Sequence, residues 1–167
     1  FADATAAKYA FTRGEQDAFA AESVRRALAA VESGAFTDEI APVAIKDRKG
    51  ERVVDRDETP FTVSVDKIPT LKPAFGKEGT VTAASSSSIS DGAAALVLAR
   101  ASAAAKAGLQ PIARIVSHAS FAREPEWFTI APVGAIELAL KRAGWKASDV
   151  DLFEVNEAFA VVTMAAM

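Results

Sequence analysis

The chain contains no cysteine and only one histidine, His118, among its 167 residues. Without cysteine it can form neither a disulfide nor a thiolate metal site, and it carries no cysteine nucleophile. A single histidine also argues against a histidine-based metal cluster and against a paired serine and histidine acting as nucleophile and base. We therefore expect no metal site in this chain and no thiol chemistry of its own.

The sequence also lacks an excess of charge of one sign. Its net charge is −3, from 19 basic and 22 acidic residues, which gives no electrostatic argument for nucleic acid or an anionic membrane as partner. A local basic patch at Lys46, Arg48, Lys49 and Arg52 is the exception. No segment has the length and unbroken apolarity of a membrane span, and no basic stretch followed by an apolar one opens the chain. We expect neither nucleic acid nor a membrane as partner.

The two ends of the sequence are unusual for a complete protein. The chain begins at Phe1 rather than at methionine, and it closes on the helix-forming run AFAVVTMAAM, residues 158–167. That run contains no glycine, asparagine or basic residue of the kind that ends a helix. We interpret the sequence as a piece of a longer polypeptide.

The first part of the chain is predicted to be mainly helical. A short helix is expected over residues 2–9, and Thr12 with Glu15 forms a capping box for a second one that ends near Gly34. This second helix has one apolar face, made of Ala20, Val24, Ala27, Leu28 and Val31. Residues 42–45 and 52–54 flank a charged turn and predict a β-hairpin. Residues 55–73 contain three prolines and predict an extended surface loop.

The second part alternates between strand and helix patterns. Apolar strands are predicted over residues 93–98, 112–116 and 150–155, and helices over residues 101–106 and 133–143. Since the strands are apolar on both faces, the pattern predicts an α/β fold with a sheet covered on both sides. The first 78 residues do not share this alternation and are expected to form an appended or inserted domain.

Two polar segments are candidate sites. Four serines, Ser85 to Ser88, precede Asp91 and Gly92, and they could form either a cradle for a polar ligand or a solvated linker. Asn156 and Glu157 follow the last predicted strand, where α/β proteins present polar groups to ligands. The amide of Asn156 could pin a turn, or it could polarise a carbonyl as the donors of an oxyanion hole do.

Three further features have weaker functional readings. Trp127 and Phe128, between two prolines, could line a substrate channel or simply pack over the edge of a sheet. His118 is expected to be a packed or surface residue. The basic hairpin is a solvated turn in the simplest reading, but it could meet phosphates or a neighbouring subunit.

Six segments, taken together and in this order, resemble the thiolase family, the acetyl-CoA acetyltransferases. They are TAAKYAFTRGEQDAFAAES, LKPAFGKEGTVTA, SDGAAALVLA, ARIVSHA, APVGAIELALKRAGW and EVNEAFA. The resemblance runs along the whole chain, but it matches only the middle of a thiolase. The family's nucleophilic cysteine would lie before Phe1, and its GHP histidine and second cysteine after Met167, so His118 is not the catalytic histidine.

The resemblance implies a thiolase-like α/β fold, part of a five-layered αβαβα arrangement with an inserted α+β loop domain. On this reading, residues 1–79 form most of the loop domain, which holds helices and a hairpin. Residues 80–110 end the N-terminal β/α half, and residues 111–167 begin the C-terminal half. Thiolases are commonly homodimers or homotetramers, and the loop domain contributes to tetramer contacts, for which the basic hairpin is a candidate.

The resemblance also implies a reaction, the reversible Claisen condensation of acetyl-CoA, or in reverse the thiolysis of a 3-ketoacyl-CoA. An acyl group passes to the nucleophilic cysteine, and the enolate of a second acetyl-CoA attacks it. In the family the asparagine of the NEAF motif holds a water that donates to the thioester oxygen as negative charge develops there, a role that carries over to Asn156. No permanently bound cofactor is implied, because the coenzyme A thioesters are substrates.

The substrate-binding positions also carry over residue by residue. Ser87 falls where the family contacts the pantetheine arm of coenzyme A, and the residues at positions lining the same channel are Phe75, Ala83, Ile89, Ala158 and Phe159. Ser85-Ser86-Ser87 departs from the Asn-Ala-Ser of many thiolases. Phe128 stands where mitochondrial acetoacetyl-CoA thiolases have an aromatic beside the acyl pocket, which favours short-chain and α-methyl-branched 3-ketoacyl-CoA substrates. The expected location is the cytoplasm, or the mitochondrial matrix in a eukaryote.

Overall fold

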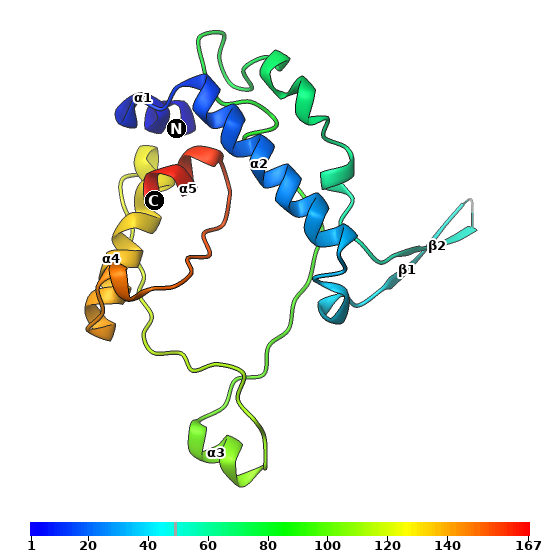
Figure 1. The fold of residues 1–167 in the computed structure, drawn as a ribbon, viewed down its shortest axis with the longest axis vertical. Coiled ribbons are helices and arrows are strands. Elements are labelled where there is room, and N and C mark those ends of the chain that lie inside the picture. The colour runs from blue at the N-terminus through cyan, green and yellow to red at the C-terminus, as the bar shows by residue number, and fades with distance from the viewer. Residues whose placement is uncertain (49) are drawn as a thin grey trace.

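A computed structural model describes residues 1–48 and 50–167 of the chain. The helices α1, α2 and α5 lie together at one end of the molecule, a two-stranded arm projects from the far end of α2, and α3 hangs on long extended segments (Figure 1). The α-helices and strands are α1 (Ala2–Tyr9), α2 (Arg13–Glu32), β1 (Val43–Asp47), β2 (Gly50–Val54), α3 (Ala101–Lys106), α4 (Ala131–Ala143) and α5 (Ala160–Ala166). The short 3-10 helices are η1 (Thr37–Glu39), η2 (Thr59–Phe61), η3 (Val65–Thr70), η4 (Pro125–Ile130) and η5 (Ala147–Asp149).

The helix α2 begins and ends where the sequence predicted. The Thr12 hydroxyl accepts a hydrogen bond from the Glu15 backbone N–H, and the Glu15 carboxylate accepts from the Thr12 backbone N–H at 2.7 Å. These reciprocal bonds satisfy donors that the first turn of a helix leaves free. At the other end Gly34 takes a φ of 72°, the left-handed conformation that favours glycine. The predicted capping box and glycine stop are confirmed.

The capping box makes the stability of α2 depend on pH. Hydrogen bonds from the backbone and the side chain of Thr12 lower the pKa of Glu15 below its ordinary value of 4.5. A carboxyl whose pKa is lowered by folding contributes stability above its unfolded pKa and loses it as the pH falls through the folded value. Acidification below about 4.5 should therefore weaken α2, and Glu15→Gln should flatten this dependence in urea unfolding at pH 6 and pH 3. Glu78→Gln, at an exposed carboxylate without a hydrogen bond in the described residues, controls for net charge; an equal flattening by both would contradict the expectation.

The predicted hairpin forms, as an antiparallel pair of β1 and β2 in which Val43 lies opposite Val54 and Ile45 opposite Arg52. It is the one sheet in the described part of the chain, and it projects away from the helices (Figure 1). Lys46 pairs with Glu51 at 3.5 Å on the solvent-exposed arm, whereas Lys49 lies outside the described residues. A two-stranded hairpin with both faces in water is marginally stable by itself.

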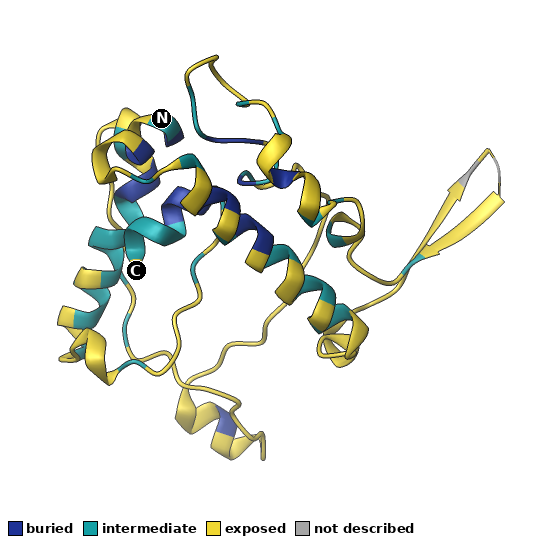
Figure 2. Ribbon diagram, turned by 45° about the horizontal axis from the view of Figure 1, so that its top comes forward, coloured by how far each residue is buried: buried dark blue, intermediate teal, exposed yellow. Residues whose placement is uncertain are grey.

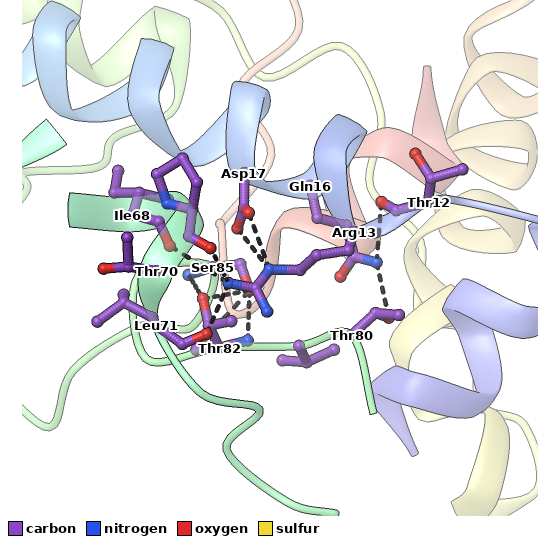
Figure 3. Close-up of polar contacts among 12 residues, drawn as sticks. Thr12, Arg13, Gln16, Asp17, Ile68, Thr70, Leu71, Thr80, Thr82 and Ser85 are labelled. Carbon is purple, nitrogen blue, oxygen red and sulfur yellow. Dashed lines mark hydrogen bonds and ion pairs between the residues drawn. The ribbon is translucent and has the colours of Figure 1, made fainter. Parts of the chain in front are cut away.

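Residues 55–73 are more ordered than the predicted surface loop. They contain η2 and η3, and the Ile68 side chain of η3 is 1% exposed against Ala20 and Ala21 of α2. The guanidinium of Arg13 holds this segment on α2, donating to the backbone oxygens of Ile68 and Leu71 at 3.2 and 2.8 Å (Figure 3). The prolines suggested an irregular loop, but a buried anchor and a side-chain donor fold it onto the helix.

The three apolar strands predicted after residue 90 do not pair into a sheet. Residues 93–98, 112–116 and 150–155 run without ladder hydrogen bonds to any strand in the described residues. Their apolar side chains stay in water, with Val97 93% exposed and Ile112 104% exposed. A strand needs a neighbour to satisfy its backbone groups, and the described residues supply none here.

The exposed segments that were predicted as strands give the chain an unusually large solvent-accessible surface. Its accessible area is 12919 Å² for a mass of 17.5 kDa, whereas the scaling for folded monomers gives about 7,900 Å². The difference is roughly 5,000 Å², and the exposed apolar side chains of residues 93–98, 112–116 and 150–155 contribute to it.

Most buried residues lie at the helical end of the molecule and include two small clusters, whereas Ala104 of α3 is buried apart from them (Figure 2). In the first, Ala2 and Ala6 of α1 pack on Val81 and Val161, with Phe11 and Phe159 at the margin. The second joins Ala20 and Ala21 of α2 to Ile68. Val81 and Thr82 are both 0% exposed. The serine run, Ser85 to Ser88, follows Val81 of the first cluster closely along the chain.

The helix α1 also holds the segment that carries Trp127 and Phe128. The buried hydroxyls of Thr5 and Thr129 are 2.6 Å apart, the ammonium of Lys8 lies 4.5 Å from the Trp127 ring centre, and the Phe1 and Phe128 rings meet edge to face at 5.9 Å. The three contacts lie on successive turns of one side of α1. They show that this aromatic segment packs against α1.

Candidate active site

The turn that begins at Asn156 is hydrogen-bonded to the serine run. Ser87 N–H donates to the Ala158 carbonyl at 3.0 Å, and Ala160 N–H donates to the Ser85 carbonyl at 2.9 Å. Ser86 and Phe159 form an isolated antiparallel bridge between these two bonds. The two candidate segments, far apart in sequence, are therefore one structural unit.

The serine run divides into a buried half and an exposed half. Ser85 is 4% exposed, and its hydroxyl accepts from Thr82 N–H at 2.9 Å, while the Ser86 hydroxyl donates to the Thr82 carbonyl at 2.7 Å. Ser87 and Ser88 lie at the exposed end, where the Ser88 and Ser90 hydroxyls are 3.0 Å apart. The run is thus not a linker between domains: its first half builds a turn, and its second half is free to meet a ligand.

A hollow of about 440 Å³ lies between α2, η2, the serine run and the start of α5. Its floor is apolar, with Phe19, Val24 and Ala160, and its rim is polar, with hydroxyls and one carboxylate. The polar residues that line the hollow are Ser23, Thr59, Thr62, Ser85, Ser86, Ser87, Ser88 and Glu157. An apolar floor with a few convergent polar groups is the usual construction of a site for a small organic ligand.

The structure brings most of the predicted binding positions to this region. Ala83 and Ser87 line the hollow, and Ala158 and Phe159 lie in the turn bonded to the serine run. The Phe75 ring packs edge-on against Phe159, with ring centres 6.1 Å apart. These residues form one continuous patch.

Two predicted positions lie elsewhere. Ile89 is fully exposed beyond the serine run, and Phe128 sits on η4 against Phe1, outside the lining of the hollow. His118, taken as a packed or surface residue, is exposed and accepts at its backbone oxygen from Arg142 at 2.6 Å. Neither Ile89 nor Phe128 lines the hollow, although Ile89 directly follows Ser88, which does.

Asn156 presents its side chain at the edge of this unit. Its backbone oxygen accepts from Ala158 N–H at 2.9 Å, which closes the turn. Its side-chain amide is exposed and makes no hydrogen bond within the described residues. The amide therefore does not pin the turn, and its two donors are available to a water or a ligand. No group of three or more histidine, cysteine or acidic side chains arranged for a metal occurs among those residues.

Sequence reasoning missed one polar residue of the site, Ser23, and the hydrogen bond that joins it to Glu157. The Ser23 hydroxyl donates to the Glu157 carboxylate at 2.7 Å across the hollow, joining positions 134 residues apart. Glu157 was visible beside Asn156 but had no assigned partner. Ser23 lies one turn from Ala20 and Ala27 on the apolar face of α2, so the helical period places it on the inward side.

The fold and this site define a class. The thiolase N-terminal domain model matches residues 1–102, and the thiolase C-terminal domain model matches residues 109–167. The chain belongs to the thiolase family. The resemblance read from the motifs is thereby confirmed.

Individual members of the family are also similar to this chain. The acetyl-CoA acetyltransferase of Pseudomonas aeruginosa is 48% identical over 166 residues, which is 98% of this chain and 42% of that protein. A probable acetyl-CoA acetyltransferase of Dictyostelium discoideum is 50% identical over 164 residues, 98% of this chain and 40% of that protein. The chain thus spans about two fifths of the length of these relatives.

Solved structures show the same fold. The crystal structure of the Bacillus anthracis acetyl-CoA acetyltransferase matches with a TM-score of 0.94 and 43% identity, covering 99% of this chain and 42% of that one. Human mitochondrial 3-ketoacyl-CoA thiolase matches with a TM-score of 0.91 and 40% identity over the same shares. The thiolase-like α/β fold is therefore confirmed for this chain, although its strand segments find no sheet partners among the described residues.

Among the described residues no helix is both long and apolar enough to cross a membrane.

Proposed function

We propose that this chain is the central part of a thiolase that acts as an acetyl-CoA C-acetyltransferase. The complete polypeptide would catalyse the reversible Claisen condensation of acetyl-CoA and the thiolysis of short-chain 3-ketoacyl-CoA. The observation that carries the proposal is the unit in which the Asn156 turn is bonded to the serine run beside an apolar-floored hollow. The names of the relatives, which cover nearly all of this chain, support the same activity.

The chemistry assigns a distinct task to each part of this unit. Condensation requires an α-carbon to lose a proton, which places negative charge on the thioester oxygen. A donor held near that oxygen lowers the barrier because it interacts more strongly with the enolate than with the ground state. The free amide of Asn156, acting through a water, is the proposed donor. Ser87, Ala83, Phe75, Ala158 and Phe159 are proposed to hold the pantetheine arm, with Ile89 nearby and Phe128 beside the acyl group.

The remaining assignments belong to the complete polypeptide. We propose that residues 1–79 are loop domain, that residues 80–110 end the N-terminal half, and that residues 111–167 begin the C-terminal half. A homodimer or homotetramer in the cytoplasm, or in the mitochondrial matrix of a eukaryote, is proposed, with no permanently bound cofactor. The projecting hairpin, marginal by itself, is consistent with an arm that meets another subunit.

The 167-residue chain alone should show no turnover. It has no cysteine to take the acyl group and no cysteine to move the proton. A thiolysis assay that follows loss of acetoacetyl-CoA should give the background rate with the purified chain and clear turnover with the complete polypeptide encoded by the source gene. Turnover by the chain alone would contradict the proposed division of labour.

A non-catalytic CoA-binding or interaction module is the alternative, favoured by the same absence of cysteine. The enzyme and the non-catalytic module predict different lengths for the reading frame of the source gene. A longer frame encoding an upstream cysteine and a downstream GHP motif supports the enzyme, and a stop codon after Met167 supports the module. Intact-mass measurement of the native protein distinguishes the two products.

A further inference from the structure

The hydrogen bond between Ser23 and Glu157 connects the middle of α2 to the residue directly after Asn156. The Ser23 hydroxyl lies 2.7 Å from the Glu157 carboxylate oxygen, a short distance for a hydroxyl donating to a charged acceptor. Both side chains line the same hollow as the serine run. The bond therefore lies among the residues that line the proposed site.

The two sides of Asn156 are held very differently. After Asn156, the chain is fixed to the serine run by the bonds at Ala158 and Ala160. Before it, residues 150–155 run extended without a strand neighbour in the described part of the chain. Asn156 thus lies at the junction between a free segment and a fixed turn. Glu157 is the first residue of the fixed side.

Only the Glu157 side chain ties this turn to α2 by a hydrogen bond within residues 1–48 and 50–167. The bonds at Ala158 and Ala160 fix the turn along the serine run, and the Ser23 bond fixes it from another direction. Two attachments leave the turn able to rotate about the line that joins them. A third attachment, away from that line, restricts this rotation. That rotation is the movement that would swing the Asn156 amide.

We propose that Ser23 and Glu157 are a positioning pair that sets the orientation of the Asn156 amide. The inference rests on the proposed thiolase function of the site. Catalytic groups must be held within a fraction of an ångström of the productive geometry, and a loop does so only when neighbouring side chains lock it. Ser23 belongs to α2, whose buried face fixes it against η3. The pair therefore adds an attachment between α2 and the turn that begins at Asn156.

A positioning role differs from a catalytic role for the Glu157 carboxylate. If the carboxylate removed a proton from substrate, Glu157→Gln would abolish turnover. If it only accepts from Ser23, the glutamine carbonyl oxygen can accept the same hydrogen bond. Glu157→Gln should then keep most of the activity, and Glu157→Ala should not.

The test uses the complete polypeptide that contains this chain, with steady-state thiolysis of acetoacetyl-CoA. We expect Ser23→Ala and Glu157→Ala each to lower kcat by about tenfold with little change in KM, the pattern of a misplaced transition-state donor. The double variant should be no slower than either single one, because both remove the same bond. Glu157→Gln should stay within about threefold of wild type.

Two matched controls separate positioning from general damage. Ser33→Ala changes a serine at the end of the same helix, whose hydroxyl donates to the Ala30 carbonyl. Glu154→Ala removes an exposed carboxylate of the same extended segment. Both should leave kcat unchanged, and thermal unfolding should show all variants folded.

The outcomes separate this inference from the function on which it rests. An inactive wild-type polypeptide overturns both. An active wild type with unchanged kcat in the two alanine variants overturns the positioning role alone. Independent, multiplying losses in the double variant, or inactivity of Glu157→Gln, would also overturn it.

Discussion

Asn156→Ala in the complete polypeptide is expected to lower kcat for acetoacetyl-CoA thiolysis by about 10²–10³-fold, the usual effect of removing one oxyanion donor. The amide is the free polar group at the edge of the unit, with no hydrogen bond to the described residues that the substitution could break. The loss should therefore appear in catalysis and not in folding. Because the amide is proposed to act through a water, a value at the lower end of the range is expected.

Which kinetic parameter changes is as informative as the size of the change. A donor that acts mainly in the transition state lowers kcat and kcat/KM together, whereas a residue that only binds substrate raises KM. Asn156→Asp should be at least as harmful, since it replaces donors with a negative charge beside the developing enolate. Asp151→Asn, at an exposed position of the same segment, is the control and should be neutral. A kcat for Asn156→Ala within threefold of wild type would remove Asn156 from the mechanism.

The local structure of the chain follows from short-range signals. The capping box of Thr12 and Glu15 and the left-handed glycines at positions 34 and 144 mark helix ends where they were expected. Such signals can be read because the interacting groups lie within four residues of one another. The hairpin is equally local, since its two strands are joined by the turn between them.

Features that depend on distant residues could not be predicted in this way. Ile68 is buried only because α2 packs over it, and the prolines around it suggested a loop. Residues 93–98 have the pattern of a buried strand, but burial needs a neighbour that the described residues do not provide. The Ser23–Glu157 bond spans 134 positions. The motif located Asn156, and only the fold showed the Ser23–Glu157 bond beside it.

The network around Arg13 supports a second large effect, this time on stability. The Arg13 guanidinium bonds both carboxylate oxygens of Asp17, at 2.9 and 2.8 Å, and also reaches the carbonyls at the end of η3 (Figure 3). The Asp17 side chain is only 9% exposed. Without Arg13 this carboxylate would stay buried without its cationic partner, a situation that costs about 3 kcal/mol.

The helix α2 contains a second ion pair of similar geometry that should contribute little to stability. Arg26 and Glu22 have the same four-residue spacing and a similar distance of 2.7 Å, but their side chains are 79% and 50% exposed. Exposed pairs contribute at most about 1 kcal/mol, because water solvates both charges when they separate. Any difference between Arg13→Ala and Arg26→Ala therefore measures burial and the attachment of η3, since charge and helix are the same.

Hydrogen exchange of the complete polypeptide can locate this effect. The Leu71 N–H donates to the Ile68 carbonyl, at the end of η3 that Arg13 holds. In Arg13→Ala this amide should exchange about a hundredfold faster, the equivalent of about 3 kcal/mol of lost local stability. Arg13→Lys should recover only part, because an ammonium lacks the planar fork that bonds Asp17 and the carbonyls together. Arg26→Ala should leave Leu71 unchanged, and an equal acceleration in both alanine variants would show that η3 is held by packing alone.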